Sequence, residues 1–333
     1  MAKNQLDALP PILRDAALTA LAEVLGSVPI DAVTPVAGGA TAAMLFRIDA
    51  GGRRYLLRME GPASPLRNPH QYVSLRMAAE AGIAPALYYA DETSRTAVMD
   101  FIQQQPLRGY PGGPPALAKA LGALLARLQA SPAFPHFVHY PDIVTRLWAH
   151  VCRTGLFAPG VLDRCTEHLE RIKEAYVWDA AHSVASHNDS IPGNILFDGI
   201  SLWMIDWESA YRNDPLVDVA IVLDNLARSP DLEEILLTAW LGHTPDGALR
   251  TRLGLVRALT RLYYAGVLFS ASATIPRASP DSDLTPPTTA GLHQAVHAGR
   301  LKVGTPATKH VLGKMFLASF LSGVATPGFG LEV

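Results

Sequence analysis

The stretch SHNDSIPGNILFD at residues 186–198, followed by LWMIDWE at residues 202–208, decides the fold and the chemistry expected of this chain. Asp189 and Asn194 lie in a loop that contains Pro and Gly and leads into the apolar run ILF. After a turn, a second apolar run, LWMI, ends at Asp206. Two short strands joined by a turn form a hairpin, so these three polar side chains are expected at one end of the pair.

Two carboxylates and one amide are hard oxygen ligands of the kind that Mg²⁺ prefers. No Cys or His spacing in the sequence matches a zinc site. Phosphoryl transfer of the protein-kinase type needs this set of groups. Asp189 is then expected to orient an acceptor hydroxyl and take its proton, while Asn194 and Asp206 hold Mg²⁺ against the phosphates of ATP. Glu208 is expected on the same side of an extended chain as Asp206, as a metal ligand, a contact to a substrate amine or a salt-bridge partner.

The first hundred residues have the pattern of a small antiparallel sheet with helices. Short runs of β-prone residues alternate with glycine turns, which predicts strands in a meander. The expected elements are a helix over 4–26, strands over 33–36, 44–48 and 55–59, a helix over 70–82, and strands over 86–90 and 96–102. Together they predict a five-stranded sheet that is complete by about residue 102.

This sheet carries the groups expected to bind a nucleotide. The glycine turn at 38–42 is expected to lay backbone N–H groups over phosphates. A cation at the end of the third strand suits the α- and β-phosphates, and backbone groups at the end of the fifth strand suit adenine. The residues expected to contact ATP are Gly38, Gly39, Thr41, Ala42, Arg58, Asp100 and Ile102.

The rest of the chain reads as mostly helical. After a connector rich in Pro and Gly at 105–115, helices are expected over 116–131, 141–155, 161–176, 215–228, 231–241, 247–272 and 308–322. The segment 273–290 is rich in Pro, Ser, Thr and Asp, and is expected to be a long mobile loop. We expect this loop to act as a lid over the acceptor.

Composition limits the functions that the chain could have. The 333 residues contain 49% hydrophobic residues, carry a net charge of −2 and include 2 cysteines. The charge balance argues against a broad surface for nucleic acid, and the charge-free runs are too short or too polar for a membrane span. Two cysteines and an N-terminus without an apolar signal segment predict a cytoplasmic protein. The sequence does not indicate an oligomeric state.

The segment 186–220 resembles the aminoglycoside phosphotransferase/choline kinase superfamily, and within it the choline/ethanolamine kinase-like branch. The resemblance rests on His-Asn-Asp, Pro-Gly-Asn and Ile-Asp-Trp-Glu in that order, followed by Asn213-Asp214-Pro215 and Asp218. Upstream, Gly-Gly-x-Thr at 38–41, Leu-Arg at 57–58, Gly-Ile-Ala-Pro at 82–85 and Asp-Phe-Ile at 100–102 match in the same order. The resemblance covers about residues 33–225.

The resemblance implies an α+β, bilobal protein-kinase-like fold with ATP and Mg²⁺ in the cleft. Its N-lobe, residues 1–102, would hold the antiparallel sheet with helices, and its C-lobe, residues 103–333, would be mostly helical. The sequence departs from the family at Ala42, where Asn is common, and at Gln129, where His is usual. The helix at 70–82 also lacks an acid at the positions that align with the ion-pair glutamate of the family.

The function expected is an ATP-dependent kinase that phosphorylates a hydroxyl of an amino alcohol, such as choline or ethanolamine, or of a related metabolite. The alternatives are a phosphotransferase for aminoglycosides or other natural products, and a nucleotide-binding pseudokinase. His187 is expected to support the catalytic loop, and Asp218 to accept hydrogen bonds from its N–H groups. Candidate walls of an acceptor pocket with cation–π contacts are Trp207, Tyr211, Trp240, Tyr263 and Tyr264.

Overall fold

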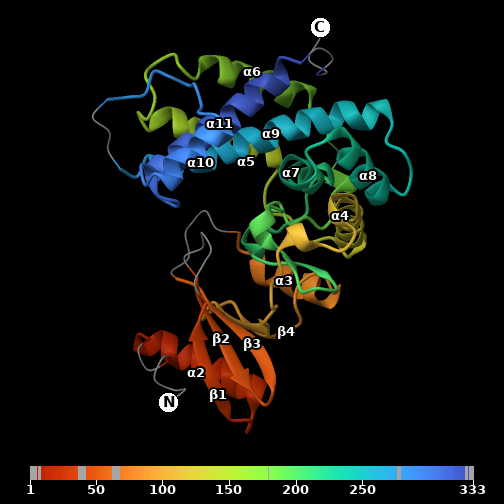
Figure 1. Cartoon of the computed structure of the whole chain (residues 1–333), viewed down its shortest axis with the longest axis vertical. Coiled ribbons are helices and arrows are strands. Elements are labelled where there is room, and N and C mark those ends of the chain that lie inside the picture. The colour runs from red at the N-terminus through yellow and green to blue at the C-terminus, as the bar shows by residue number, and fades with distance from the viewer. Residues whose placement is uncertain are drawn as a thin grey trace. The chain divides into compact units, whose positions relative to one another are not determined.

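The chain divides into two compact units, and each unit is made of two separate stretches of sequence. The first unit contains Met1–Phe137 and Ser183–Thr244, and the second contains Val138–His182 and Pro245–Val333. This computed structural model describes residues 6, 9–36, 43–61, 68–178, 180–275, 279–326 and 329. Figure 1 follows the chain through both units. The lobe boundary predicted after residue 102 lies inside the first unit and stays a prediction.

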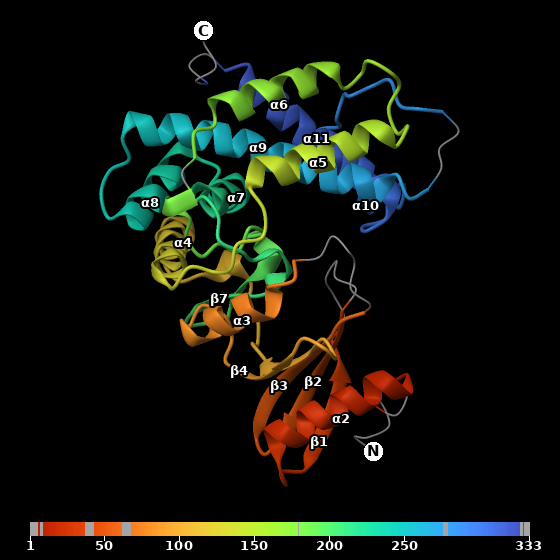
Figure 2. The ribbon, with the colours of Figure 1, turned by 180° about the vertical axis from the view of Figure 1, so that it is seen from behind.

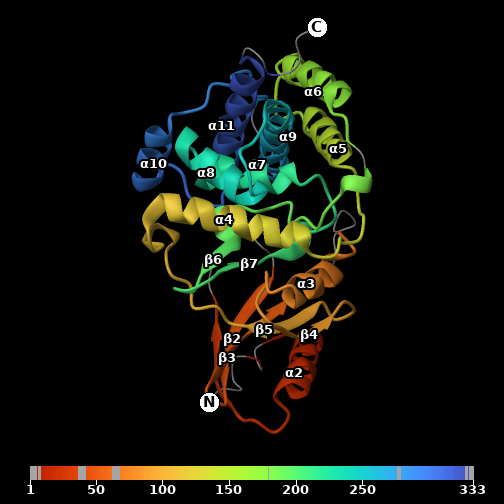
Figure 3. The same ribbon diagram turned by 90° about the vertical axis from the view of Figure 1, so that its right-hand side faces the viewer.

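The first unit contains a five-stranded antiparallel sheet in the order β1-β2-β3-β5-β4. Its strands are β1 (Ile30–Pro35), β2 (Met44–Ala50), β3 (Arg53–Met59), β4 (Leu87–Asp91) and β5 (Thr96–Asp100). Each predicted strand is present, with ends that differ by a few residues. Figure 3 shows the sheet with its helices α2 (Pro11–Leu25) and α3 (Gln71–Glu80). The structure confirms the sheet predicted from the alternating runs and glycine turns.

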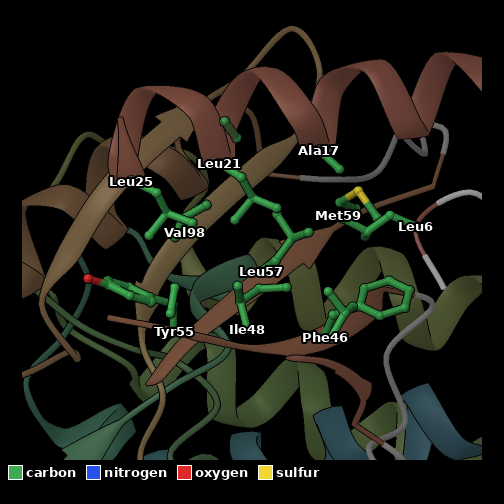
Figure 4. Packing of buried hydrophobic residues seen from close by; sticks show 13 residues of the cluster. Leu6, Ala17, Leu21, Leu25, Phe46, Ile48, Tyr55, Leu57, Met59 and Val98 are labelled. Carbon is green, nitrogen blue, oxygen red and sulfur yellow. The ribbon is translucent and has the colours of Figure 1, made fainter. Parts of the chain in front are cut away.

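Helix α2 covers one face of this sheet. It begins at Pro11, because proline is tolerated in the first helical turn but not in the interior. Leu21 and Leu25 of α2 meet Leu57 of β3 in a core of buried apolar side chains (Figure 4). Since successive residues of a strand alternate between faces, Arg58 lies on the face of β3 opposite to this core. The hydrophobic pattern of β3 thus determines on which face the Arg58 cation is presented.

The remainder of the first unit is a helical part with one small hairpin. Strands β6 (Ile195–Phe197) and β7 (Leu202–Met204) pair antiparallel, with Ile195 opposite Met204. The helices are α4 (Gly113–Ala130), α7 (Leu216–Leu226) and α8 (Pro230–Leu241), and the short 3₁₀ turns are η1 (Leu107–Gly109), η3 (Pro192–Asn194) and η4 (Trp207–Ser209). Helices α4 and α8 approach closely at Gly122, where an added Cβ would collide with the backbone carbonyl of Leu236.

The second unit is built from helices. They are α5 (Tyr140–Arg153), α6 (Asp163–Ala175), α9 (Gly247–Ser272), α10 (Thr289–His297) and α11 (Pro306–Val324), with a 3₁₀ turn η2 (Ala180–His182). Helix α9 packs against both α5 and α11, as Figure 2 shows from behind. Two glycines allow this close packing, because Gly266 faces Leu147 and Gly313 faces the ring of Phe269. Among the described helices, none is long and apolar enough to cross a membrane.

The segment expected to be a long mobile loop is more ordered than its composition suggests. Its last residues belong to α10, which the sequence analysis missed and which begins after the N-cap Thr288. In the middle, the backbone of Asp281 bonds to Leu156 and Ala158 at 2.9 Å each. The Asp281 carboxylate lies 2.7 Å from His310 Nε2 and 2.7 Å from Lys314 Nζ. Composition indicates polarity, but it does not indicate which polar residue is paired with a buried cation.

Candidate active site

A buried carboxylate organises the loop that precedes the β6–β7 hairpin. Asp218 of α7 is fully buried and accepts hydrogen bonds from the backbone N–H groups of His187 at 2.8 Å and Asn188 at 2.9 Å. The hydroxyls of Ser186 and Ser190 donate to the same carboxylate at 2.7 and 2.5 Å. A carboxylate that accepts this many bonds fixes the loop backbone on α7.

Asn188 holds the loop in a backbone conformation that few residues adopt. Its φ is +61°, in the left-handed region that asparagine tolerates better than most residues. The side-chain amide of Asn188 donates to the carbonyls of Ser209 at 2.9 Å and Tyr211 at 3.1 Å, and accepts from Asn213 Nδ2 at 2.7 Å. The bend at Asn188 directs the next residue, Asp189, away from this buried network.

His187 connects the loop to the chain segment that carries Asp206. Its Nε2 lies 2.8 Å from the carbonyl oxygen of Ile205, and its ring lies 4.6 Å from the ring of Trp207. Since Ile205 immediately precedes Asp206, the histidine sets the distance between the two carboxylate-bearing segments. The side chain therefore has a structural contact at the position where support was expected.

Asp189 and Asn194 interact directly. The Asn194 amide nitrogen donates to the Asp189 carboxylate at 2.8 Å and to the Asp189 carbonyl at 2.9 Å. The backbone N–H of Ile205 donates to the carbonyl of Asn194 at 3.0 Å, which joins this pair to the end of the hairpin. With its N–H groups directed to Asp189, the Asn194 amide presents Oδ1 as its cation-binding atom.

Asp206 follows β7 in a left-handed conformation, with φ +66° and ψ +66°. The chain then enters η4. It is therefore not extended between Asp206 and Glu208, and the argument that placed the two side chains on one side of a strand is wrong. Both carboxylates nevertheless reach the same atom, because Arg58 Nη2 lies 2.9 Å from Asp206 and 2.6 Å from Glu208. Glu208 is therefore in an ion pair, which is one of the roles considered for it.

Arg58 has a third acidic partner, Glu60, which the sequence analysis missed. Arg58 Nη1 lies 2.5 Å from Oε1 of Glu60, and Glu60 is only 1% exposed. Gln71, the first residue of α3, donates from Nε2 to Oε2 of Glu60 at 2.7 Å. A signal was present in the sequence, since Glu60 lies two residues after Arg58 and so continues the same face of the strand.

Helix α3 is itself fastened to the chain after η4. Ser74 of α3 and Asn68 before it both donate to the carbonyl of Ala210, at 2.8 and 2.7 Å. Ala210 lies two residues beyond Glu208. The α3 helix that supplies Gln71 is thus bonded to the segment that supplies Asp206 and Glu208, so the acidic groups around Arg58 form one connected structure.

The charges in this cluster shift each other's protonation. Burial alone would lower the pKa of Arg58, but attraction to Glu60, Asp206 and Glu208 outweighs it and raises that pKa. Burial raises the pKa of Asp206; the Arg58 cation opposes this shift and repulsion from Glu208 adds to it. Arg58 is therefore permanently charged, while burial makes the negative charge of Asp206 less favourable.

The donor set at the hairpin suits Mg²⁺ when a nucleotide supplies the remaining ligands. In the part of the chain that the structure describes, no three His, Cys, Asp or Glu side chains form a metal-binding group by themselves. Mg²⁺ commonly uses one or two carboxylates and takes its other oxygens from phosphates and water. Asp206 and the Asn194 amide meet that requirement with hard oxygen atoms, and both lie beside the Asp189 carboxylate or the Arg58 cation.

The structure describes only some of the other residues expected to bind the nucleotide. Gly38, Gly39, Thr41 and Ala42 fall outside the described residues. The Asp100 carboxylate accepts from the Tyr88 hydroxyl at 2.9 Å and lies 3.4 Å from Arg53, and its N–H donates to Ala86. The contact of Asp100 with adenine stays a prediction. Ile102 is half-buried, and its contact with adenine stays a prediction.

Two of the proposed acceptor-pocket residues belong to the core of the first unit. Trp207 is 2% exposed, packs edge-on against Phe134 at 5.9 Å and donates from Nε1 to the carbonyl of Met204. Tyr211 is 3% exposed and lies edge-on to Phe137 at 5.7 Å. Both rings are buried in this structure, and their role as walls of an acceptor pocket stays a prediction.

The remaining aromatic candidates have different surroundings. Trp240 of α8 donates from Nε1 to Gln129 Oε1 at 2.8 Å, and Gln129 in turn donates to the carbonyl of Pro215 at 2.9 Å. Gln129 therefore links three helices where the family usually has His. In the second unit, Tyr263 and Tyr264 are half-buried neighbours with ring centroids 5.6 Å apart, so both stay candidates for acceptor binding.

Comparison with known proteins agrees with this geometry. The profile of the phosphotransferase enzyme family (APH) matches residues 32–253, which include the sheet, the hairpin and the Asp218 loop. The chain belongs to this family. The match confirms the predicted phosphotransferase class and the resemblance to the aminoglycoside phosphotransferase/choline kinase superfamily.

Individual members of the superfamily differ greatly in sequence from this phosphotransferase. Protein LicA of Haemophilus influenzae is 36% identical over 58 residues, a match that spans 17% of this chain and only 22% of that relative. A choline/ethanolamine kinase family protein from Mesorhizobium loti has a TM-score of 0.69 at 18% identity and covers 96% of this chain and 97% of its own. Spectinomycin phosphotransferase, solved with ADP and spectinomycin, has a TM-score of 0.55 at 11% identity and 96% coverage of both chains. These likenesses confirm the α+β kinase-like fold class.

Proposed function

We propose that this phosphotransferase is an ATP- and Mg²⁺-dependent kinase that transfers the γ-phosphate to a hydroxyl of a small molecule. The observation that carries the proposal is the direct bond between Asp189 and Asn194, next to Asp206 and Arg58. These are the base, the amide, the metal-binding acid and the phosphate-binding cation that phosphoryl transfer needs. A pseudokinase does not transfer phosphate, so it would not need all four of these side chains in contact with one another.

Each residue has a separate task in the proposed reaction. Asp189 accepts a hydrogen bond from the acceptor hydroxyl and takes its proton as the acceptor oxygen bonds to the γ-phosphorus and the bond from that phosphorus to the bridging oxygen of ATP breaks, which releases ADP. The Asn194 amide holds the Asp189 carboxylate in the orientation that this step needs. Arg58 binds phosphate oxygens and neutralises their charge. Asp206 and Asn194 would hold Mg²⁺, which would supply electrostatic stabilisation of the transferring phosphate.

For the acceptor we propose an amino alcohol of the choline or ethanolamine type, or a related metabolite. The support is the sequence resemblance to that branch. Aminoglycosides carry several ammonium groups and would need a strongly acidic site. After residue 246 the chain offers few acids, namely Asp281, Asp283 and Glu332, and Asp281 is already paired with Lys314.

The test is a panel of acceptors incubated with ATP, with and without Mg²⁺, in which ADP and the phosphorylated product are both measured. We expect metal-dependent product with choline, ethanolamine or another small amino alcohol, and none with spectinomycin or aminoglycosides. Transfer to an aminoglycoside would move the assignment to the antibiotic-modifying class. Absence of ATP binding in the presence of Mg²⁺ would contradict kinase activity altogether.

A further inference from the structure

The cation of this site is held from its own strand. In Arg58 the two terminal nitrogens have different partners, because Nη1 lies on Glu60 and Nη2 lies on Asp206 and Glu208. Glu60 is fixed in turn by Gln71, the first residue of α3. The only acid of α3 is Glu80, at its exposed C-terminal end. This helix therefore contributes the amide of Gln71, and not a glutamate, to the group around Arg58.

The two groups of partners differ in their access to water. The Glu60 side chain is 1% exposed, whereas those of Asp206 and Glu208 are 23% and 33% exposed. A buried carboxylate that has an ion pair on one oxygen and a hydrogen bond on the other does not exchange its partner readily. A carboxylate at the solvent edge can release a cation and turn to another ligand at a smaller desolvation cost.

We propose that Glu60 and Gln71 are positioning residues for Arg58: Gln71 fixes Glu60, Glu60 anchors Nη1, and Nη2 exchanges Asp206 and Glu208 for a phosphate oxygen when the nucleotide binds. This inference rests on the proposed kinase function and adds the device that aims the cation. The strand acid and the helix amide together replace an ion pair between strand and helix. Asp206 is released toward Mg²⁺ by the same exchange.

The exchange explains the choice of arginine at this position. A guanidinium has several N–H donors in a rigid fork, so one nitrogen can stay on Glu60 while the other changes partner. A lysine has a single nitrogen, which would have to divide its hydrogen bonds between Glu60 and the phosphate. The bonds from Asn68 and Ser74 to Ala210 keep α3, and with it Gln71, in register with the Asp206 segment.

The first variant is Glu60→Gln, which removes the anchoring charge and keeps the size of the side chain. We expect the Kd for ATP in Mg²⁺, measured by titration calorimetry, to rise about 10- to 100-fold, as for a misplaced catalytic group. The KM for ATP should rise with it, whereas the KM for the acceptor should not change. Glu80→Gln, a change of the same kind on the exposed end of α3, is the matched control and should leave all three constants unchanged.

The second variant exchanges the two side chains, as Glu60→Gln together with Gln71→Glu. The contact between positions 60 and 71 can then re-form, because Gln at 60 can donate to Glu at 71 and still present its carbonyl oxygen to Arg58, and the net charge of the cluster is restored. We expect the double variant to regain most of the ATP affinity lost in Glu60→Gln and to melt near the wild-type temperature. This rescue distinguishes positioning of Arg58 from a general loss of stability.

The outcomes separate this inference from the proposed function. If wild type binds ATP with Mg²⁺ and Glu60→Gln binds it equally well, the anchoring role is wrong and the kinase assignment stands. A double variant that folds but binds ATP no better than Glu60→Gln also overturns the inference. If wild type does not bind ATP at all, the proposed function fails, and the inference fails with it.

Discussion

The Asp189 side chain is held in place by a hydrogen bond from Asn194. The Asn194 amide bonds to it at 2.8 Å, and the loop backbone before it is fixed on Asp218. If Asp189 is the base, as proposed, it is oriented before any acceptor arrives, which is what efficient proton transfer requires.

The substitution Asp189→Asn preserves the size of this side chain and removes its capacity to accept a proton. We expect kcat to fall by about 10²–10⁴-fold, the usual effect of removing a positioned base. The affinity for ATP, measured by calorimetry, should stay at the wild-type value, because Asp189 contacts the acceptor and not the nucleotide. Loss of ATP binding together with turnover would contradict the role of base.

Asp206 is proposed to bind Mg²⁺ and not the acceptor, so its replacement should change both kcat and the response of the activity to Mg²⁺. In Asp206→Asn the Arg58 cation keeps its contacts to Glu60 and Glu208, so the fold should be retained. We expect kcat to fall by about 10²–10³-fold, since one group that balances charge in the transition state is lost. The activity that remains should no longer respond to Mg²⁺ concentration in the range that saturates wild type. A variant with near wild-type turnover in Mg²⁺ would rule out Asp206 as the metal ligand.

At the scale of single residues, spacing predicted some of the site and missed the rest. Asp189, Asn194 and Asp206 are linked by a short hairpin, so their proximity follows from local geometry that a sequence displays. The contact between Glu60 and Gln71 joins a strand to a helix across a segment of about ten residues, and no spacing rule connects them. The burial of Trp207 and Tyr211 could not be predicted, because composition does not distinguish a buried ring from an exposed one.

Among the elements, the Asp281 segment shows how a polar stretch is tied to a helical unit. Burial would raise the pKa of Asp281, but hydrogen bonds from Lys314, His310 and the backbone N–H of Asp283 outweigh burial and lower it well below its ordinary value. A lowered pKa means that the ionised group stabilises the fold above about pH 4 and that this stabilisation is lost as pH falls further.

Asp281→Asn should therefore destabilise the protein in a pH-dependent way. Removing one member of a buried ion pair costs about 3 kcal/mol or more, because Lys314 is left only 9% exposed without a counter-charge. We expect this difference in unfolding free energy from wild type at pH 7, and a smaller difference at pH 3, because the unfolded chain of wild type then binds a proton at Asp281 while the folded protein still holds the carboxylate ionised. Urea unfolding at the two pH values measures both. A difference that grows on acidification would contradict the ion-pair role of Asp281.

The proposed lid function can be tested without disturbing this ion pair. Replacing residues 284–287 by Gly and Ser leaves Asp281 and the α10 N-cap Thr288 in place. If the segment closes over the acceptor, the KM for the acceptor should rise, and the ratio of ATP hydrolysis to phosphate transfer should rise with it, because water gains access. The affinity for ATP should not change. An unchanged KM and ratio would make the segment a connection without a role in catalysis.

Element type was easier to predict than element ends. The five strands and the helices from α2 to α9 follow hydrophobic periodicity, which records the face that each element buries. Helix α10 was missed because its short sequence, TAGLHQAVH, directly follows a stretch rich in proline. The 3₁₀ turn η4 could not be predicted, because it depends on the left-handed Asp206 that precedes it.

For the molecule as a whole, nucleotide binding should be visible as a gain in stability. A ligand at about 100 times its Kd stabilises the folded state by about 2.7 kcal/mol if the unfolded chain does not bind it. We expect ATP with Mg²⁺ to raise the midpoint of chemical unfolding of wild type and of Asp189→Asn, and to raise that of Asp206→Asn much less. Mg²⁺ alone is the control and should have little effect. Equal shifts in all three proteins would contradict the assigned division of roles.

Because each unit consists of two separate stretches of sequence, the parts of one unit are synthesised at different times. A ribosome releases α5 well before α9 and α11, because the second stretch of the first unit is made in between. At synthesis rates of about 5–20 residues per second, roughly 10–30 s separate the end of α5 from the end of α11. Throughout that interval Val144 and Val151 of α5, buried in the finished protein, lack the α9 surface that α5 packs against. Nascent chains of this kinase-like protein should therefore engage chaperones that bind short apolar segments, and should do so before residue 247 has been added.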